Sequence, residues 1–279
     1  NKLSPFRNFK LADERCNNVL RRMNYCKFIT IDEMSETIKL KLNIKNSKND
    51  YYKKGFPWIR NFVKNELKQI LSSDQIENKC LIIRTSIDYN YQINAQKNIS
   101  DSLSDSDIEG SLVSIESTTG EIKALIGGTN YKKSQFNRAT MSIRQTGSIF
   151  KLFVYAAALK NGFKPDKYVI DKKMKWGNYS PKNAGSKYYG IIKLKDALKT
   201  SSNSIAVQLT DRLGIDTIIS TANDFKIGIK RKLKNNLSIA LGVDEQTLIS
   251  MVAAYTVISN DGNYIKPTII KEIIDDTGK

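Results

Sequence analysis

The stretch Arg144–Leu159, RQTGSIFKLFVYAAAL, decides the fold that we expect, because a tight turn leads directly into a long apolar run. Gly147 allows the backbone to turn tightly, and Ser148 suits the first position of a helix, where small hydroxyl side chains cap free N–H groups. The apolar residues that follow recur at helical spacing, and Asn161-Gly162 is typical of a helix end. The stretch therefore predicts a buried helix that begins at Ser148.

Ser148 and Lys151 are the candidate chemical pair of this stretch. Residues three apart on a helix share a face, with Cβ atoms roughly 5–6 Å apart, so the lysine amine can reach the serine hydroxyl. A nucleophile beside a base can form a covalent intermediate, and the free N–H groups of a helix start would stabilise an oxyanion. Lysine is a base only when neutral, and lowering its pKa by about 3 units costs about 4 kcal/mol, part of which burial supplies.

S-x-x-K by itself is a weak signal, and a capped surface helix with a solvated lysine is the alternative interpretation. Two observations favour chemistry. Ser148 is the only serine in the chain that a lysine follows three residues later, and its helix is too apolar for the surface. The chain also contains no histidine, which excludes a Ser-His-Asp triad and a Cys-His nucleophile. A serine enzyme built from these residues must use another base, and lysine is available.

Composition limits the other classes of function. The net charge of +17 and pI near 9.6 suggest an anionic partner. No basic stripe alternates with aromatic residues, so we expect no nucleic-acid partner. The run Lys230–Lys234 is interpreted as a solvated loop, and weak attraction to an anionic cell-wall or membrane surface is expected. Cys16, Cys26 and Cys80 are an odd number without histidines, so we expect buried or partly buried thiols rather than a disulfide framework or a metal site.

Hydrophobic periodicity and turn residues predict a mixed helix and strand order. The clearest strand signal is a hairpin, in which Ser117-Thr118-Thr119-Gly120 joins two apolar runs. Thr30 and Glu33 form a capping-box pattern at the start of a helix. The expected helices are 13–23, the one that Thr30 opens, 55–71, 91–99, 194–200, 204–213 and 247–259. The expected strands are 79–87, 112–115, 122–126 and 265–274, and 176–190 is expected to be a loop.

Five stretches in order carry a family resemblance: FNRAT (Phe136–Thr140), RQTGSIFK (Arg144–Lys151), YSPKN (Tyr179–Asn183), KDALKTSSNSIAV (Lys195–Val207) and SIALG (Ser238–Gly242). Together they resemble the transpeptidase domain of class A penicillin-binding proteins, the bifunctional peptidoglycan synthases. The superfamily signature combines S-x-x-K with an S-x-N element and K-T-G. Two positions depart mildly, because the family usually has proline where this chain has Thr146 and Leu152.

The resemblance implies an α+β fold of the β-lactamase/DD-transpeptidase kind, with an antiparallel sheet, helices on both faces and a helical subdomain. It divides the chain into the end of a glycosyltransferase module (1–45), an interdomain linker (46–108) and the transpeptidase domain (109–279). The catalytic glutamates of the family's glycosyltransferase lie upstream of such a segment, so no glycosyl transfer is assigned here. The resemblance also implies a parent protein anchored in the bacterial inner membrane, with this part on the extracytoplasmic side.

By the same resemblance, Ser148 attacks the D-Ala–D-Ala carbonyl of a peptidoglycan stem peptide and forms an acyl-enzyme. Lys151 is the base, Ser201 relays a proton, and Asn203 hydrogen-bonds the substrate. β-Lactams would acylate Ser148, other cell-wall synthesis proteins are possible partners, and no cofactor is needed. S-x-N is weak in isolation, since Ser47–Asn49 also fits it, and capping of a helix by Ser201 and Asn203 is the alternative.

The third element of the signature does not occur, since the chain contains no K-T-G or K-S-G. In the family this strand binds the substrate carboxylate and completes the oxyanion hole, so we expect a fragment that is nearly inactive unless its parent continues beyond Lys279. Two alternatives stay open: a degenerate or split fragment that only binds partners, and a serine β-lactamase or β-lactam sensor. The first 108 residues argue against the second, and the gene sequence past Lys279 decides the first.

Overall fold

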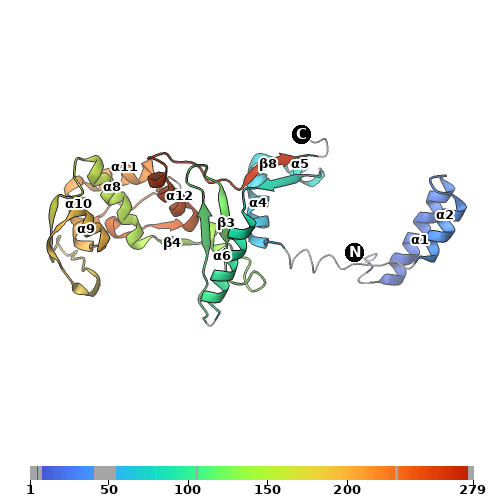
Figure 1. Cartoon of the computed structure of the whole chain (residues 1–279), viewed down its shortest axis with the longest axis horizontal. Helices are drawn as coiled ribbons and strands as arrows, with labels where there is room; N and C mark the ends of the chain where they lie inside the picture. The colour runs from blue at the N-terminus through green and yellow to red at the C-terminus, as the bar shows by residue number, and fades with distance from the viewer. Residues whose placement is uncertain are drawn as a thin grey trace. The chain divides into compact units, whose positions relative to one another are not determined.

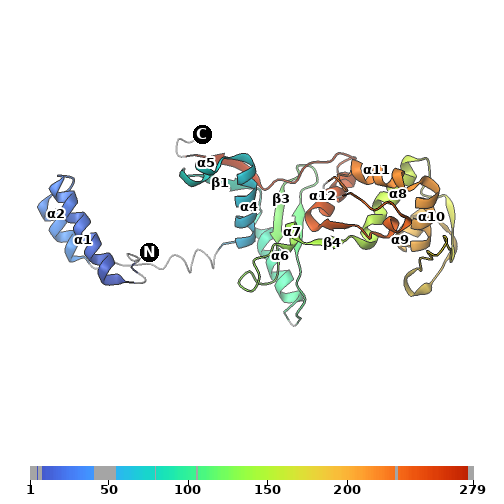
Figure 2. The ribbon, with the colours of Figure 1, turned by 180° about the vertical axis from the view of Figure 1, so that it is seen from behind.

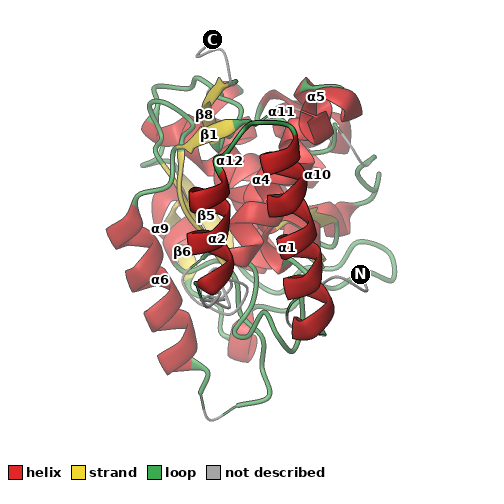
Figure 3. Ribbon diagram, turned by 90° about the vertical axis from the view of Figure 1, so that its right-hand side faces the viewer, coloured by secondary structure: helices red, strands yellow, loops and turns green. Residues whose placement is uncertain are grey.

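The computed structural model describes residues 5, 8–40, 55–78, 80–104, 106–229 and 232–275, in two compact units, Asn1–Phe56 and Pro57–Lys279. The first unit contains α1 (Phe9–Tyr25) and α2 (Ile31–Lys39), which pack side by side (Figure 3). The predicted capping box is confirmed, because Glu33 N donates to Thr30 Oγ1 at 3.2 Å and Thr30 N donates to Glu33 Oε2 at 2.7 Å. In the described part of the chain, no helix has the length and apolar character needed to cross a membrane.

The second unit holds most of the chain (Figure 1). Its helices are α4 (Pro57–Ile70), α5 (Ser73–Asn78), α6 (Tyr89–Ser102), α7 (Arg138–Met141), α8 (Lys151–Lys160), α9 (Leu194–Lys199), α10 (Asn203–Leu213), α11 (Ile215–Asp224) and α12 (Leu248–Ser259). Its strands are β1 (Ile82–Thr85), β2 (Leu112–Ile115), β3 (Ile122–Ile126), β4 (Ile143–Gln145), β5 (Tyr168–Asp171), β6 (Gly190–Lys193), β7 (Glu245–Thr247) and β8 (Ile270–Ile274). Three 3₁₀ turns are described: η1 (Gly147–Phe150), η2 (Ala184–Ser186) and η3 (Leu237–Leu241).

The predicted hairpin is confirmed as β2 and β3, which pair antiparallel with Leu112 opposite Ile126. Because β3 is almost wholly buried, helices must cover it: α4 and α6 pack against β3, and α12 packs against β2 (Figure 1). The described strands form four antiparallel pairs, namely β1–β8, β2–β3, β4–β7 and β5–β6. The expected α+β class, with helices packed around antiparallel strands, is confirmed.

A second cluster of helices forms the main hydrophobic core, where α8 contacts α10, α11 and η3 (Figure 2). The aromatic rings of Phe150 and Phe153 meet edge to face at 5.1 Å, and the ring of Phe225 lies 5.3 Å from that of Phe153. Phe150 and Phe153 are fully buried. The core therefore fixes the start of α8, which carries Lys151, against the start of α10.

The predicted helix that begins at Ser148 is confirmed within one residue, but its first turn is a 3₁₀ turn. Ser148 lies inside the 3₁₀ turn η1, and α8 begins at Lys151. The backbone is tied to a neighbouring segment just before the serine, because Thr146 N donates to Asp244 O at 3.0 Å and Gly147 N donates to Gly242 O at 2.9 Å. The tight turn at Gly147 is confirmed by its φ of +57°.

Several elements escaped the sequence patterns. Helix α11 and the short pairs β4–β7 and β5–β6 were not predicted, and the expected loop 176–190 contains η2. Within the run Lys230–Lys234, the first two residues lie outside the described part. The three cysteines are free thiols, but only Cys16 is partly buried; Cys26 and Cys80 are exposed, so the expected burial is wrong for these two. The three-part division at residues 45 and 108 stays a prediction, while packing divides the chain after Phe56.

Candidate active site

The four residues predicted to form the site meet at the amine of Lys151. Its Nζ atom lies 3.1 Å from Ser148 Oγ and 3.0 Å from Ser201 Oγ. It also lies 2.7 Å from the backbone oxygen of Ser201 and 2.5 Å from Asn203 Oδ1. Residues some fifty positions apart in sequence thus converge on one atom.

The turn that presents Ser148 is held on both sides. Gly242 ends η3 with a φ of +71°, and a Cβ atom placed there would lie 2.0 Å from the carbonyl oxygen of Gly147. Only glycine allows so close an approach of two backbones. On the other side, the Tyr255 hydroxyl donates to the carbonyl of Ile149 at 2.7 Å. Neighbouring segments therefore position the Ser148 hydroxyl, which is exposed to solvent.

Ser201 reaches Lys151 through an unusual backbone conformation. Its φ of +54° is left-handed, which costs a residue other than glycine about 1–3 kcal/mol. The conformation turns the carbonyl oxygen and the hydroxyl of Ser201 to the same amine. Backbone strain of this kind persists only where the surroundings determine it, and it is enriched at functional sites.

Burial prepares Lys151 to act as a base. Its side chain is 1% exposed, and burial lowers the pKa of its amine from 10.5 to about 8. No carboxylate contacts this amine among the residues that the structure describes. The neutral amine has two N–H groups and one lone pair. The Ser201 carbonyl and Asn203 Oδ1 accept but cannot donate, so they take the two N–H groups and leave the lone pair for a serine hydroxyl.

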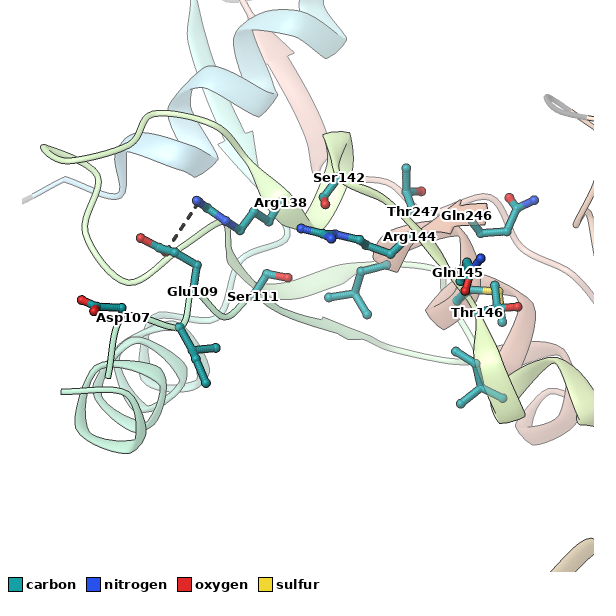
Figure 4. A pocket seen from close by; sticks show the side chains of 14 residues that line it. Asp107, Glu109, Ser111, Arg138, Ser142, Arg144, Gln145, Thr146, Gln246 and Thr247 are labelled. Atoms are coloured by element: carbon teal, nitrogen blue, oxygen red, sulfur yellow. Dashed lines mark ion pairs between the residues drawn. The ribbon is translucent and has the colours of Figure 1, made fainter. Parts of the chain in front are cut away.

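A pocket of the second unit lies beside this site and does not contain it (Figure 4). Its volume is about 630 Å³. Its lining includes Thr146, which precedes the turn η1, and Ile149, which follows Ser148 within that turn. Arg138 and Glu109 face each other across it, 3.5 Å apart. Its lining contains no lysine, so it offers no hydroxyl with an amine base beside it. The chemistry therefore belongs to the Lys151 cluster.

Sequence reasoning missed the residues that support the cluster. Asp171, Ser202 and Asn183 form a buried hydrogen-bond network behind the Ser201–Asn203 turn. Two of them lie in the matched stretches, Asn183 in YSPKN and Ser202 in KDALKTSSNSIAV, but nothing in the sequence indicated Asp171, their partner on β5. Gly242 was visible only as the last residue of the SIALG match, without its contact with Gly147.

Comparison with known proteins supplies the family. The family model for the penicillin binding protein transpeptidase domain matches residues 110–279. Penicillin-binding protein 1A of Aquifex aeolicus is 41% identical over 180 residues, which cover 62% of this chain and 24% of that protein. Penicillin-binding protein 2D of Bacillus subtilis is 32% identical over 287 residues, which cover 99% of this chain and 41% of that protein. The chain thus spans less than half the length of these relatives.

Two solved structures share the fold. Penicillin-binding protein 1A from Haemophilus influenzae superposes with a TM-score of 0.79 and 22% identity, over 100% of this chain and 56% of that one. PonA1 from Mycobacterium tuberculosis, in complex with penicillin V, has a TM-score of 0.72 and 24% identity, over 80% of this chain and 63% of that one. From the family match and these relatives we conclude that the chain belongs to the penicillin-binding protein transpeptidase family, in its class A branch.

Proposed function

We propose that this chain carries the acylation site of a serine D-Ala–D-Ala transpeptidase that cross-links peptidoglycan stem peptides and reacts with β-lactams. One observation carries the proposal: a buried lysine, whose pKa burial lowers to about 8, lies 3.1 Å from an exposed serine hydroxyl. The similarity to penicillin-binding proteins 1A and 2D supports the same substrate class.

In acylation, Ser148 Oγ attacks the carbonyl carbon of the D-Ala–D-Ala peptide bond, and its proton passes to the lone pair of Lys151 Nζ. The tetrahedral intermediate then breaks its C–N bond. Ser201 Oγ, 3.0 Å from Lys151 Nζ, passes its proton to the amine of the departing D-alanine and takes the proton that Lys151 received from Ser148, so Lys151 is neutral again. The product is an ester on Ser148.

In the second half-reaction, the amine of another stem peptide attacks the ester carbonyl. The attacking amine loses a proton to the neutral Lys151 Nζ as the new amide bond forms. The C–O bond to Ser148 breaks, and the serine oxygen takes that proton from Lys151. Asn203 Oδ1 accepts from Lys151 while its Nδ2 donates to Lys182 O at 2.8 Å. Asn203 therefore orients the base, and substrate binding by its amide requires that the contact with Lys182 be exchanged.

The proposal places the site on the extracytoplasmic side of the bacterial inner membrane, where peptidoglycan is cross-linked. It includes the division into a glycosyltransferase end (1–45), a linker (46–108) and a transpeptidase domain (109–279). It also includes a parent protein with upstream glycosyltransferase activity and contacts with other cell-wall synthesis proteins. These parts rest on the family membership.

Peptide mapping tests the proposal in the full-length protein. We expect labelled penicillin to modify the peptide that contains Ser148, and Ser148→Ala to abolish the label. Ser47→Ala, at the other S-x-N match, is the matched control and should be labelled like the wild type. A label on another serine, or a label that survives in Ser148→Ala, would refute the assignment.

A further inference from the structure

A buried carboxylate lies behind the active-site turn without touching the amine of Lys151. Asp171 ends β5 and is 1% exposed. It accepts hydrogen bonds from Ser202 Oγ at 2.9 Å, from Asn183 Nδ2 at 3.0 and 3.1 Å, and from Tyr189 N at 3.1 Å. No cation pairs with it among the described residues. Burying a charge is costly unless hydrogen bonds compensate it, so the donors around Asp171 must be held in place.

The carboxylate is one of two acceptors that orient the Asn183 amide. A carboxylate only accepts, so the NH₂ group of Asn183 must face Asp171, and the same group also donates to Lys187 O at 2.9 Å. The oxygen of the same amide then points to α10, where it accepts from Asn203 N at 2.9 Å and Ser204 N at 3.0 Å. These N–H groups belong to the first turn of α10, which has no partner inside the helix for them. Asn183 therefore caps α10 from a different segment of the chain.

Ser202 makes the second link from Asp171 to the same turn. Its hydroxyl donates to Asp171 and accepts from Ile205 N at 3.1 Å, as the N-cap of α10. Ser202 stands between the two residues that contact Lys151. Its neighbour Ser201 has the left-handed backbone described above, and its neighbour Asn203 receives the cap from Asn183. Two hydrogen-bond chains from one carboxylate thus hold both sides of the turn.

We propose that Asp171 is a positioning residue that acts through Asn183 and Ser202 to hold Ser201 and Asn203 against Lys151. This inference rests on the proposed acylation chemistry for its consequence, but the hydrogen-bond relay is independent of it. Without the carboxylate, the Asn183 NH₂ group keeps only Lys187 O as an acceptor, so the amide oxygen is held less firmly against α10 and the turn at Ser201 loses one support for its strained backbone.

Asp171→Asn tests the relay with a side chain of the same size. The new amide must present an NH₂ group to Asn183, Ser202 or Tyr189, each of which already directs a donor at this position. We expect the acylation rate constant for penicillin to fall by about 100-fold, as for a small misplacement of catalytic groups. The Kd of the initial penicillin complex should change less, because Asp171 does not reach the solvent-exposed serine.

Exchanging the two side chains separates positioning from simple stability. In Asp171→Asn/Asn183→Asp, the new carboxylate at 183 can accept from Asn203 N, Ser204 N and the amide at 171, so the cap on α10 is restored, while Lys187 O loses the donor that Asn183 supplied. We expect this double variant to acylate at least about tenfold faster than Asp171→Asn. Single Asn183→Asp places two carboxylates face to face, so it should acylate more slowly than both Asp171→Asn and the double variant. Asp166→Asn is the control, since Asp166 is 65% exposed and its pairs with Lys193 and Lys195 lie at the surface.

Amide hydrogen exchange at Asn203 and Ser204 gives a readout that needs no activity. We expect faster exchange at both positions in Asp171→Asn, wild-type exchange in Asp166→Asn, and recovery in the double variant. If Asp171→Asn acylates and exchanges like the wild type, the relay is refuted, as it is if the double variant recovers neither property. If exchange responds as expected but the wild-type protein takes no penicillin, the relay stands and the proposed function fails.

Discussion

At the scale of single residues, Lys151 determines what the site can do. Burial removes the water that would stabilise its charge, and the four contacts around the amine come from neutral groups. A carboxylate in the same place would hold the lysine charged and prevent it from accepting a proton. The neutral setting is thus the feature that makes Lys151 a base.

Lys151→Arg tests the base role. A guanidinium stays protonated at every working pH and cannot take the Ser148 proton. We expect penicillin acylation to fall by about 10²–10⁴-fold, the range for loss of a general base. Lys160→Arg is the control, because Lys160, at the far end of α8, is half exposed and pairs with Asp224 of α11. A near-normal acylation rate in a folded Lys151→Arg protein would exclude the base role.

The pH dependence follows from the same group. Since the pKa of Lys151 is lowered to about 8, the neutral base accumulates above pH 8, and the acylation rate should rise through that value and level off.

The free energy of unfolding should also rise with pH. Between pH 8 and 10.5 the unfolded chain holds the proton that the folded chain has lost, so stability rises with pH there, by about 3 kcal/mol in total. Stopped-flow acylation and urea unfolding across pH 6–10 measure both; an acylation rate that is constant with pH would contradict the assignment.

At the scale of elements, the nucleophile depends on the contact between two 3₁₀ turns. The turn η1, which carries Ser148, is tied to η3 through Gly147 N and Gly242 O. Thr146 adds a hydrogen bond from its hydroxyl to the same carbonyl at 3.3 Å. At this position the family usually has proline, which could not make the backbone bond from Thr146 N to Asp244 O. Threonine at this position therefore replaces the rigidity of proline with two hydrogen bonds, one from its backbone N–H and one from its hydroxyl.

Gly242→Ala should separate the two turns. Its added Cβ would lie 2.0 Å from Gly147 O, and its φ is positive. Gly162→Ala is the matched control, since its φ of +82° is also left-handed but nothing lies within 4 Å of the added Cβ. We expect about 1 kcal/mol of destabilisation in the control and at least about 2 kcal/mol more for Gly242→Ala in urea unfolding, with a lower acylation rate. Equal effects of both variants would show that the close approach is unimportant.

At the scale of the whole second unit, a buried glutamine joins the α6 layer to the hairpin. Gln92 is 2% exposed, its Nε2 donates to Leu125 O at 3.1 Å, and its Oε1 accepts from Leu125 N at 2.8 Å. Its amide therefore pairs with β3 as another strand would. The pair β1–β8 adds a second long-range link, because residues 82–85 meet residues 270–274.

Gln92→Leu should weaken the unit strongly, although the new side chain is apolar and similar in size. It leaves a buried N–H and a buried C=O of Leu125 without partners, and we expect a loss of about 2–4 kcal/mol. Gln96→Leu on the same helix is the control, because Gln96 is exposed and should change stability by less than about 0.5 kcal/mol. Chemical denaturation measures both variants. If they behave alike, the glutamine does not close the strand edge.

Local patterns in the sequence were sufficient for the elements that short-range physics controls. The capping box at Thr30, the hairpin β2–β3 and helix α12 were predicted within a few residues, because hydrophobic period, caps and turn residues act over neighbouring positions. The pair Ser148 and Lys151 was also accessible, since three residues of spacing nearly fix their distance. The short pairs β4–β7 and β5–β6 have too few residues for a readable period.

Only the tertiary structure decided what surrounds that pair. The sequence placed Ser148 at a helix start, whereas contacts with Gly242 and Asp244 put it in a 3₁₀ turn. Ser201 and Asn203 could be proposed as site residues only through resemblance, and Asp171 could not be found at all. Their meeting depends on the packing of α8 against α10 across some fifty residues, and no local preference specifies a contact of that range. The sequence determined which groups react, and packing determined their geometry and the burial of Lys151 that makes it a base.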